Sequence, residues 1–376
     1  MSENWNKYKP RLRDGVDIYL ESESNVTFVY LSSRKRVKVK CHPLLIESLS
    51  WLTGEFSVEE LNTRIMNSST EQVLPNDGFL EFLKYLYQKG FLVPENWIEE
   101  VSLPSRYKKR LERQLNFLLD ITDSVDEVAR IQSRIYQAEI ALFGLGSVGS
   151  WLCRELVMMG FHKFLLIDYD IVSEFDISRH AFFEQKMIGL RKTEAAKQMV
   201  IDIDKAASVK VVNHALTTDT DLVSLLSNIN FVINTADEPY IGYTGLKLSR
   251  YCVQYKKPLM IAGGFDAHLG SLGELIIPGN TPCADCYTSF FKESLKDWKP
   301  ISHPVKDRTS SFGGLSSLSV LAASTAAMTI LRYFIDSTAT FEGERGELLF
   351  DNYDLSVFSV PRNPTCPICS DLNNEK

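Results

Sequence analysis

The stretch Ala141-Leu-Phe-Gly-Leu-Gly-Ser-Val-Gly149 decides the interpretation of the fold. A short apolar run, 139–143, ends in three glycines with the spacing G-x-G-x-x-G, namely Gly144, Gly146 and Gly149. This spacing lets a strand turn tightly into a helix whose free N–H groups face an anion. The next apolar run ends at Asp168, 22 residues after Gly146, where a carboxylate can accept hydrogen bonds from ribose hydroxyls. The stretch therefore predicts a nucleotide site; the alternative is a glycine-rich turn without a ligand.

Strands and helices are expected to alternate after these glycines. The expected strands are 164–168, 209–214, 231–234 and 259–263. Such alternation is typical of an α/β fold with a doubly wound, Rossmann-like and mainly parallel sheet, in which ligands lie at the carboxyl ends of the strands. A long apolar stretch, 315–334, contains six Ser or Thr residues and one Arg, which favours a buried helix over a membrane span.

Composition narrows the classes of function. The 376 residues are 44% hydrophobic and 24% charged, as in a soluble protein of two or three domains. The formal net charge of -7 argues against a broad nucleic-acid surface, so nucleic acid is a minority hypothesis. The N-terminus has no apolar signal core, and we therefore expect a cytoplasmic protein without a membrane partner.

Residues 1–95 are expected to form a small domain in which strands precede three helices. The expected strands are 26–31 and 36–40, and the expected helices are 43–52, one that starts at Ser57 with a capping box to Glu60, and 77–90. The unit resembles the PqqD-like domain that recognises precursor peptides, on the motifs Arg13-Asp-Gly15, Leu44-Leu45 and Lys89-Gly-Phe-Leu92. A generic winged-helix module is the alternative.

Basic side chains gather at the second expected strand: Arg34, Lys35, Arg36, Lys38 and Lys40. If the resemblance holds, the strand edge near 26–40 pairs with an extended peptide through main-chain hydrogen bonds. The basic residues would then favour an acidic leader segment. Charges of this kind also protect edge strands against aggregation, and both uses are compatible.

Residues 96–140 are expected to form a helical linker and dimer arm. A basic helical stretch, 106–119, is followed by a linker, 120–126, and by a helix, 125–137, that leads into the glycine motif. Five basic residues in eight usually indicate a solvated helix face.

Three charged positions indicate cleavage of a nucleoside triphosphate rather than hydride transfer. Such an enzyme needs cations on the phosphates and a carboxylate for Mg²⁺, because negative charge concentrates there in the transition state. Arg179, Lys192 and Asp237 supply both. Taken singly, each of them is explained as well by a surface salt bridge.

Residues 113–369 resemble the ubiquitin-activating-enzyme superfamily, which includes the ThiF/MoeB-type adenylating enzymes of thiamine and molybdopterin biosynthesis. The resemblance rests on Gly144-x-Gly-x-x-Gly149, Asp168-x-Asp170, Ser178-Arg179, Gly189-x-x-Lys192, Asp237, the turn 263–273 and two cysteine pairs. It implies that Asp168 binds ribose, Gly146 the phosphate region, Arg179 and Lys192 the phosphates, and Asp237 the Mg²⁺ of bound ATP. It also implies nucleotide contacts for Gly144, Gly149, Asp170 and Asp176.

Arg113 matches the arginine that this superfamily extends across a dimer interface to the partner's ATP, which implies a homodimer. The chain departs from the superfamily's pattern in two places, and both bear on which residue roles the resemblance implies here. Asp176 stands where the family usually has asparagine, so a polar contact to ATP there is expected to be altered. The chain between Arg113 and Gly144 is also longer than in the compact bacterial members.

Cysteine spacing predicts a metal site. Four of the seven cysteines form two C-x-x-C pairs, Cys283 with Cys286 and Cys366 with Cys369, enough for a closed tetrahedral Zn²⁺ of structural type. Two redox pairs are the alternative. The crossover segment 287–314 contains no cysteine, which disfavours a thioester relay, and Cys41, Cys153 and Cys252 are expected to be buried thiols.

These observations together suggest a homodimeric, Mg²⁺-ATP-dependent enzyme that adenylates a precursor peptide. The chain resembles the peptide-antibiotic enzymes of microcin C and pantocin A biosynthesis. The resemblance implies that the activated group is a side-chain carboxylate, that of glutamate in the pantocin type, or a carboxamide or terminal group. It also implies that dehydrative cyclisation follows.

Four other functions are weighed against this one. A sulfur-carrier adenylyltransferase would use the same ATP site but would not need residues 1–95. A tRNA-modifying adenylating enzyme would need a broad basic face. A scaffold without activity would be expected to have lost Arg179, Lys192 or Asp237, and a nicotinamide-dependent dehydrogenase would not require them. The sequence does not identify the residue that acts as general base. His268 and His303 are candidates only because histidine titrates near neutrality.

Overall fold

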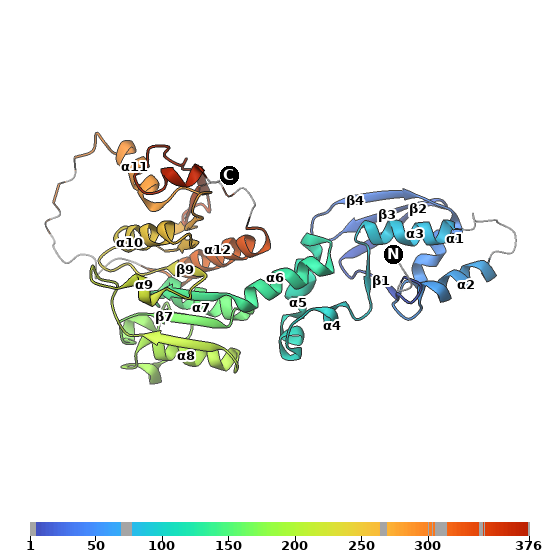
Figure 1. The fold of residues 1–376 in the computed structure, drawn as a ribbon, viewed down its shortest axis with the longest axis horizontal. Coiled ribbons are helices and arrows are strands. Elements are labelled where there is room, and N and C mark those ends of the chain that lie inside the picture. The colour runs from blue at the N-terminus through green and yellow to red at the C-terminus, as the bar shows by residue number, and fades with distance from the viewer. Residues whose placement is uncertain are drawn as a thin grey trace. The chain divides into compact units, whose positions relative to one another are not determined.

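The computed structural model describes residues 5–68, 77–263, 269–299, 301–302, 304, 314–337, 341 and 343–374 (Figure 1). The chain divides into two compact units, Met1–Ser133 and Arg134–Lys376. The roles expected from the sequence stay predictions: peptide recognition for 1–95, a helical linker and dimer arm for 96–140, and an ATP-binding adenylation domain with the crossover segment and the C-terminal zinc site for 141–376.

A six-stranded sheet forms the centre of the second unit. Its strand order is β12-β10-β9-β6-β7-β8, and every neighbouring pair is parallel except β10 with β12. The chain adds β7 and β8 on one side of β6 and then β9 and β10 on the other, so the strand order reverses at β6. The expected doubly wound, mainly parallel sheet is confirmed. The strands are β6 (Glu139–Phe143), β7 (Lys163–Ile167), β8 (Ser208–Val212), β9 (Phe231–Asn234), β10 (Leu259–Ile261) and β12 (Glu274–Ile276).

The helices of this unit follow the strands in the expected alternation. They are α7 (Ser147–Met158), α8 (Lys192–Ile203), α9 (Leu222–Leu225), α10 (Ile241–Gln254), α11 (Ala284–Ser294) and α12 (Ser316–Ile335), with short 3₁₀ turns at Glu174–Asp176, Gln185–Met187 and Ser370–Asn374. All four residues of β9 are buried, which agrees with a central parallel strand covered on both faces.

Helix α12 is the one helix among the described residues that is long and apolar enough to cross a membrane. Leu318, Ala322, Ala326 and Ile330 recur every four residues, so they share one face, and all four are buried. The helix packs against α7, where the Ser324 hydroxyl donates a hydrogen bond of 2.6 Å to Glu155 Oε1. Helix α12 is thus packed within the unit, as its Ser and Thr content predicts.

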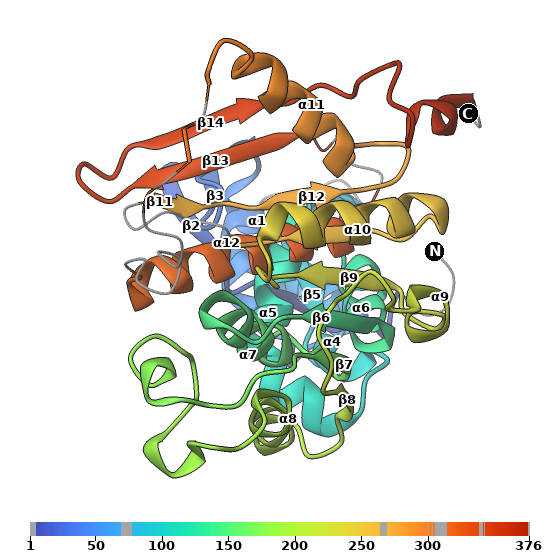
Figure 2. The same ribbon diagram turned by 90° about the vertical axis from the view of Figure 1, so that its left-hand side faces the viewer.

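A second, smaller sheet was not expected from the sequence. Its order is β11-β13-β14 and both pairings are antiparallel; Figure 2 shows β13 and β14 side by side. The strands are β11 (Leu269–Ser271), β13 (Glu344–Leu349) and β14 (Leu355–Ser359). An ion pair of 2.6 Å between Arg345 Nη1 and Glu274 Oε1 ties this sheet to β12.

The first unit contains a three-stranded antiparallel sheet, β2-β3-β4, and a two-stranded one, β1-β5. The strands are β1 (Pro10–Leu12), β2 (Val16–Ser22), β3 (Asn25–Tyr30), β4 (Arg36–Lys40) and β5 (Leu92–Pro94). The sequence did not indicate β2, because Val16 is its one buried residue and an exposed strand carries no apolar alternation.

Three helices follow the sheet, as expected, and three more complete the described segment. They are α1 (Pro43–Ser48), α2 (Val58–Ser68), α3 (Gly78–Gln88), α4 (Trp97–Glu100), α5 (Ser105–Thr122) and α6 (Val125–Gln137), with a 3₁₀ turn at Leu49–Trp51. The expected capping box at α2 is present: the Ser57 N–H donates to Glu60 Oε2 at 2.7 Å, and the Glu60 N–H donates to Ser57 Oγ at 3.3 Å.

The buried Arg13 fastens this unit together. Its side chain is 2% exposed and donates four hydrogen bonds of 2.7–3.0 Å, which end on the Gly90 and Leu119 carbonyls and on the carboxylates of Asp120 and Asp123. The loop after β1 is therefore joined to the end of α3 and to the end of α5. The motif Arg13-Asp-Gly15 thus has a structural function in addition to its value as a family marker.

Replacing Arg13 by methionine should destabilise the first unit by about 3 kcal/mol, because the two carbonyls and two carboxylates lose charged donors. Hydrogen–deuterium exchange of residues 5–133 in the full chain measures the loss. Arg11→Met is the matched control, since the Arg11 side chain is 29% exposed and forms surface pairs, for which about 1 kcal/mol or less is expected. Equal effects of the two substitutions would contradict the assignment.

Candidate nucleotide-binding and metal sites

A cavity of about 560 Å³ lies at the carboxyl ends of the central strands of the second unit. Its walls come from the segments that follow β6, β7, β8 and β9, which is where a doubly wound sheet opens at its reversal of strand order. The structure brings most of the predicted nucleotide residues to this one cavity: Gly144, Gly146, Asp168, Asp170, Arg179, Lys192 and Asp237.

The glycine motif shapes the floor of this cavity. Gly144 has φ +87°, and a Cβ there would stand 2.7 Å from the Ala236 nitrogen. A Cβ on Gly149 would collide with the Gly144 carbonyl and the Thr235 hydroxyl, so this glycine permits close packing and lies behind the cavity. Around Gly146 there is open space, and α7 begins directly after it. The first free N–H groups of α7 therefore lie where an anion can reach them.

Asp168 is held firmly at the end of β7. Its Oδ2 accepts a hydrogen bond of 2.6 Å from the Leu145 N–H, and its Oδ1 accepts one of 2.8 Å from the Asp170 N–H. Burial raises the pKa of Asp168, whereas these two N–H donors oppose the rise. The Asp168 carboxylate thus links the glycine turn after β6 to the end of β7, and it borders the cavity.

Lys192 is the buried cation of the cavity. It opens α8, its side chain is 8% exposed, and its Nζ lies 3.0 Å from Asp170 Oδ2 and 3.5 Å from Asp176 Oδ1. A lysine that forms ion pairs with two carboxylates can exchange one of them for a ligand anion. The cavity therefore contains a positioned ammonium group.

Asp176 lies behind Lys192, among buried groups. Its Oδ2 accepts hydrogen bonds from the Ser173 N–H at 2.8 Å and the Ser173 hydroxyl at 2.9 Å. Burial opposes its ionisation, but the Ser173 N–H and the Lys192 ammonium outweigh burial, and the pKa of Asp176 is lowered. The sequence resemblance implies asparagine at this position, and the aspartate present here forms an ion pair with Lys192. A direct contact of Asp176 with nucleotide stays a prediction.

His180 is a cavity residue that the sequence analysis missed. Its Nδ1 lies 2.8 Å from the Asp176 carbonyl oxygen and its Nε2 lies 3.3 Å from Asp176 Oδ1. Burial lowers the pKa of His180 to about 4, and the nearby Lys192 adds to this effect. The imidazole is therefore neutral near pH 7 and adds no positive charge to the cavity.

Arg179 and Asp237 are exposed side chains of the same cavity. Asp237 follows β9, and Glu238 beside it supplies a second carboxylate. Oxygen ligands of this kind suit Mg²⁺, which commonly keeps one or two protein carboxylates together with phosphate oxygens. Asp237 and Glu238 could hold Mg²⁺. Their role as metal ligands and the role of Arg179 stay predictions.

Three further lining residues directly follow strands: Tyr169 after β7, His214 after β8 and Thr235 after β9. The rule that ligands lie at the carboxyl ends of parallel strands could have found them from the sequence. Ser178, part of the Ser178-Arg179 motif, also lines the cavity, as does Phe175, which no sequence signal marked.

Arg113 lies on α5 in the first unit and is exposed. Phe117 and Ile121, also exposed, follow at intervals of four residues on the same helix face. Its action across a dimer stays a prediction. The crossover segment 287–314 lies largely outside the described residues from residue 300 onward, as do His268 and His303.

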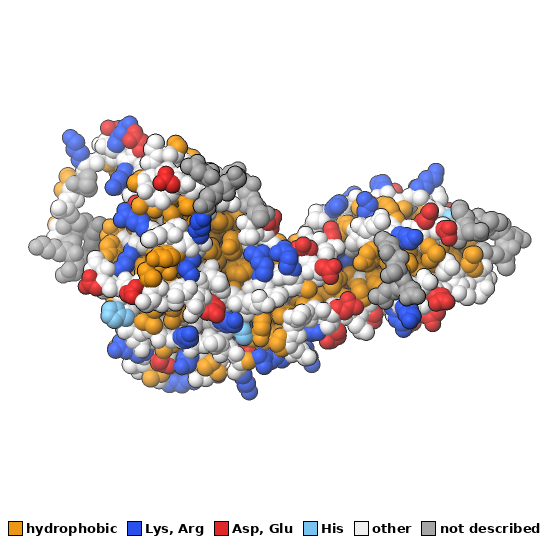
Figure 3. All heavy atoms as spheres, viewed as in Figure 1, with side chains coloured by type: hydrophobic (Ala, Val, Ile, Leu, Met, Phe, Trp, Pro, Cys, Tyr) orange, Lys and Arg blue, Asp and Glu red, His pale blue; other side chains and the backbone are white. Residues whose placement is uncertain are grey.

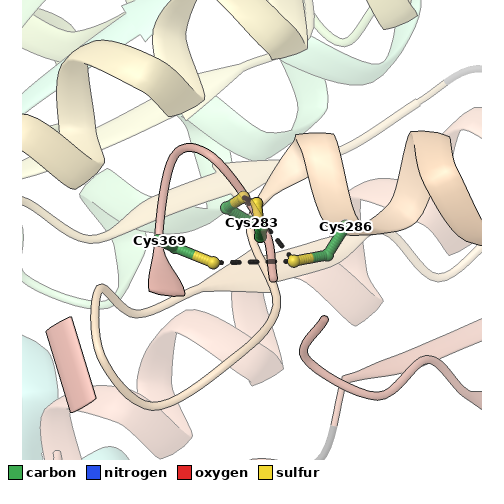
Figure 4. A group of neighbouring side chains, drawn as sticks. Cys283, Cys286 and Cys369 are labelled. Atoms are coloured by element: carbon green, nitrogen blue, oxygen red, sulfur yellow. Dashed lines mark hydrogen bonds between the residues drawn. The ribbon is translucent and has the colours of Figure 1, made fainter. Parts of the chain in front are cut away.

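The two cysteine pairs meet in one buried cluster. The Sγ–Sγ distances are 3.8 Å for Cys283 with Cys286, 3.6 Å for Cys283 with Cys366 and 3.5 Å for Cys286 with Cys369, and all four sulfurs lie within 4.8 Å of one another. Figure 4 shows Cys283, Cys286 and Cys369 turned toward one another. A tetrahedral Zn²⁺ with Zn–S bonds of about 2.3 Å needs sulfurs about 3.8 Å apart. The cluster fits this ion with no coordination position left for a substrate.

The surroundings of Cys286 favour its thiolate form. The Cys283 thiol and the Asn363 N–H, the latter at 3.4 Å, are directed at Cys286 and lower the pKa of its thiol. A metal ion needs the thiolate form. Cys153 and Cys252 are buried elsewhere, and Cys41 is partly buried, in agreement with ordinary structural thiols.

Replacing Cys366 by serine should remove most of the bound zinc, because a tetrahedral site with three thiolates and a hydroxyl binds the ion far more weakly. The wild-type chain should contain about one zinc per molecule by elemental analysis, and the variant should also melt at a lower temperature. Cys41→Ser is the control, since Cys41 lies outside the cluster. Equal zinc content in both variants would refute the metal site.

Comparisons with known proteins agree with this fold and site. Protein HesA, vegetative, from Trichormus variabilis is 26% identical over 243 residues, which are 63% of this chain and 83% of HesA. The chain spans about half or less of several longer relatives, among them adenylyl- and sulfurtransferases and ubiquitin-like modifier-activating enzymes.

Two solved structures share the fold over nearly the whole chain. E. coli MccB, crystallised with succinimide, has a TM-score of 0.69 at 18% identity and covers 96% of this chain and 99% of its own. PaaA has a TM-score of 0.67 at 18% identity, with 93% of this chain and 99% of PaaA covered. At these identities the likeness shows the fold.

Fold and cavity together define an ATP-dependent adenylating enzyme with a Rossmann-like nucleotide-binding sheet. The ThiF family model matches residues 111–368, more than half of the chain. The protein belongs to the ThiF family.

Proposed function

We propose that the protein uses Mg²⁺-ATP to adenylate a group of a ribosomally made peptide: a side-chain carboxylate such as that of glutamate, or a carboxamide or terminal group. The observation that carries the proposal is the convergence of Arg179, Lys192 and Asp237 on one cavity of the ThiF-family sheet. In the carboxylate case, an oxygen of the peptide attacks the α-phosphorus of ATP and pyrophosphate leaves. The resulting acyl adenylate has AMP as its leaving group, so a neighbouring backbone nitrogen can displace AMP and close a ring.

The cavity supplies what this reaction needs. Lys192 and Arg179 offer positive charge to the phosphates, where negative charge grows in the transition state. The open N-terminus of α7 at Gly146 receives a phosphate, and Asp168 accepts hydrogen bonds from the ribose. Asp237 would hold Mg²⁺, which would supply positive charge to the phosphates.

A peptide substrate is supported by the structural neighbours and by the first unit. MccB has been crystallised with MccA, and it is described as a microcin C7 biosynthetic enzyme. Its likeness to this chain covers 96% of the residues and so includes the first unit. A sulfur-carrier adenylyltransferase would have no evident use for that unit.

The edge of β4 is the proposed binding place for the peptide leader. In the described sheet β4 pairs with β3 alone, so its outer edge offers free main-chain groups. Val37 and Val39 are half-buried on one face, whereas Arg36, Lys38 and Lys40 are exposed on the other. An extended peptide that adds to this edge gains main-chain hydrogen bonds, and acidic side chains gain the basic face.

Two further parts complete the proposal. Arg113, exposed on α5, reaches the ATP of a second copy in a homodimer, and the apolar Phe117 and Ile121 near it suit a protein contact. The Cys₄ cluster holds a structural Zn²⁺ that ties the C-terminal segment to α11.

A tRNA substrate receives no support from Figure 3, where Lys and Arg are interspersed with Asp and Glu over the face in view.

Replacing Asp237 by asparagine should lower peptide-dependent AMP formation roughly 100-fold or more, the effect of removing one charge-stabilising group. Release of AMP and pyrophosphate, followed by chromatography, measures it. Asp219→Asn is the matched control, because Asp219 is exposed and does not line the cavity. Unchanged turnover in Asp237→Asn would remove this residue from the metal role.

Reversing charge on β4 by the double substitution Arg36→Glu and Lys40→Glu should weaken peptide binding about ten-fold, equivalent to about 1.4 kcal/mol. The affinity of the full chain for the precursor peptide, measured by fluorescence anisotropy, should also lose most of its salt dependence. Lys205→Glu with Lys210→Glu is a matched double control on the second unit. Equal affinities for both double variants would argue against the β4 edge.

A further inference from the structure

A second cavity of about 170 Å³ adjoins the nucleotide cavity within the second unit. Gly263, which follows β10, lines both cavities. Because β10 pairs in parallel with β9, the segment that ends in Gly263 runs beside the segment that carries Asp237. A group in the small cavity therefore lies next to the place proposed for the phosphates.

The small cavity has apolar walls and a polar end. Ile241 and Leu246 on α10 and Ile261 on β10 supply the apolar walls. Gly245, whose Cβ would stand 3.0 Å from the Ile261 side chain, contributes no side chain of its own. A short aliphatic stem suits such walls.

The polar end carries charges that cancel. Arg345 Nη1 lies 2.6 Å from Glu274 Oε1, with the two side chains 26% and 12% exposed, and the guanidinium lies 4.9 Å from the centre of the Phe291 ring. All three residues line the cavity. An anionic guest would meet the Glu274 carboxylate and a cationic guest would meet the Arg345 guanidinium, whereas a neutral dipole can use both.

A hydroxyl group without a partner lies at the same cavity. Tyr287, on α11, is 3% exposed, and its buried oxygen makes no hydrogen bond within the described part of the chain. Buried hydroxyl groups ordinarily have partners, because leaving them unpaired costs free energy. Within the described residues the Tyr287 hydroxyl therefore has an unused hydrogen bond, which a guest that reaches it can complete.

We propose that this cavity is a specificity subsite that receives one uncharged side chain of the peptide substrate, with a short aliphatic stem and a hydrogen-bonding end. The guest accepts a hydrogen bond from Arg345 or Tyr287 and donates one to Glu274, as a carboxamide does. The inference rests on the proposed peptide substrate and assigns the subsite next to the reacting group. Tyr287 acts here by binding the guest and takes no part in the chemical step.

Three small four-carbon probes test the proposal on the full chain: butyramide, which is uncharged, butyrate, which is anionic, and butylammonium, which is cationic. Ligand-observed NMR titrations give the affinity of each for the wild type, for Tyr287→Phe and for Tyr251→Phe. The last is a matched control, a buried tyrosine of α10 that does not line this cavity. The thermal midpoint of each variant checks folding, and binding of the ATP analogue AMPCPP checks the nucleotide cavity.

We expect butyramide to bind the wild type more tightly than the two charged probes. Tyr287→Phe should weaken butyramide about five-fold, the loss of one hydrogen bond, with an unchanged melting temperature and unchanged AMPCPP binding. Equal binding of all three probes, preference for a charged probe, absence of binding, or no effect of Tyr287→Phe would overturn the subsite. Failure of the proposed function would appear separately, as the absence of peptide-dependent AMP formation by the wild type.

Discussion

The nucleotide cavity depends on one close approach of backbone to backbone. The turn at Gly144 meets the segment after β9, where Thr235 Oγ1 donates a hydrogen bond of 2.8 Å to the Gly144 carbonyl. There is no room for a Cβ at Gly144 or at Gly149. This contact holds the end of β6 against the end of β9, on the side of β6 away from β7, where the strand order reverses. The opening of the sheet, the start of α7 and the position of Asp237 all follow from it.

The charge of Lys192 is paired within the cavity by carboxylates of the chain itself. Lys192 lies between Asp170 and Asp176, and His180 Nε2 lies 3.3 Å from Asp176 Oδ1. These ion pairs restrict the conformational freedom of the lysine. In the proposed function it exchanges a carboxylate for a phosphate. The aspartate at 176, where the sequence resemblance implies asparagine, supplies one of the two ion pairs.

Two cavities of different charge character lie at the carboxyl ends of neighbouring strands of the sheet. Segments after β6, β7 and β9 present cations and carboxylates, which suit a nucleotide and Mg²⁺. Beside them, β10 and β12 border a small cavity whose charged pair is neutral overall, which suits an uncharged guest. Gly263 lies at the border of both. In the proposed function, the strand order therefore places the cavity for activation beside the cavity for side-chain selection.

The sequence by itself determined the alternation of strands and helices, the glycine turn, the acid at residue 168 and the two cysteine pairs. Each of these rests on local spacing, which is visible along the chain. The tertiary structure alone decided that His180 and Tyr287 border cavities, that Arg345 pairs with Glu274, and that Asp176 lies behind Lys192. Such neighbours come from elements up to 71 residues apart, as for Arg345 and Glu274, and their meeting depends on packing rather than on periodicity.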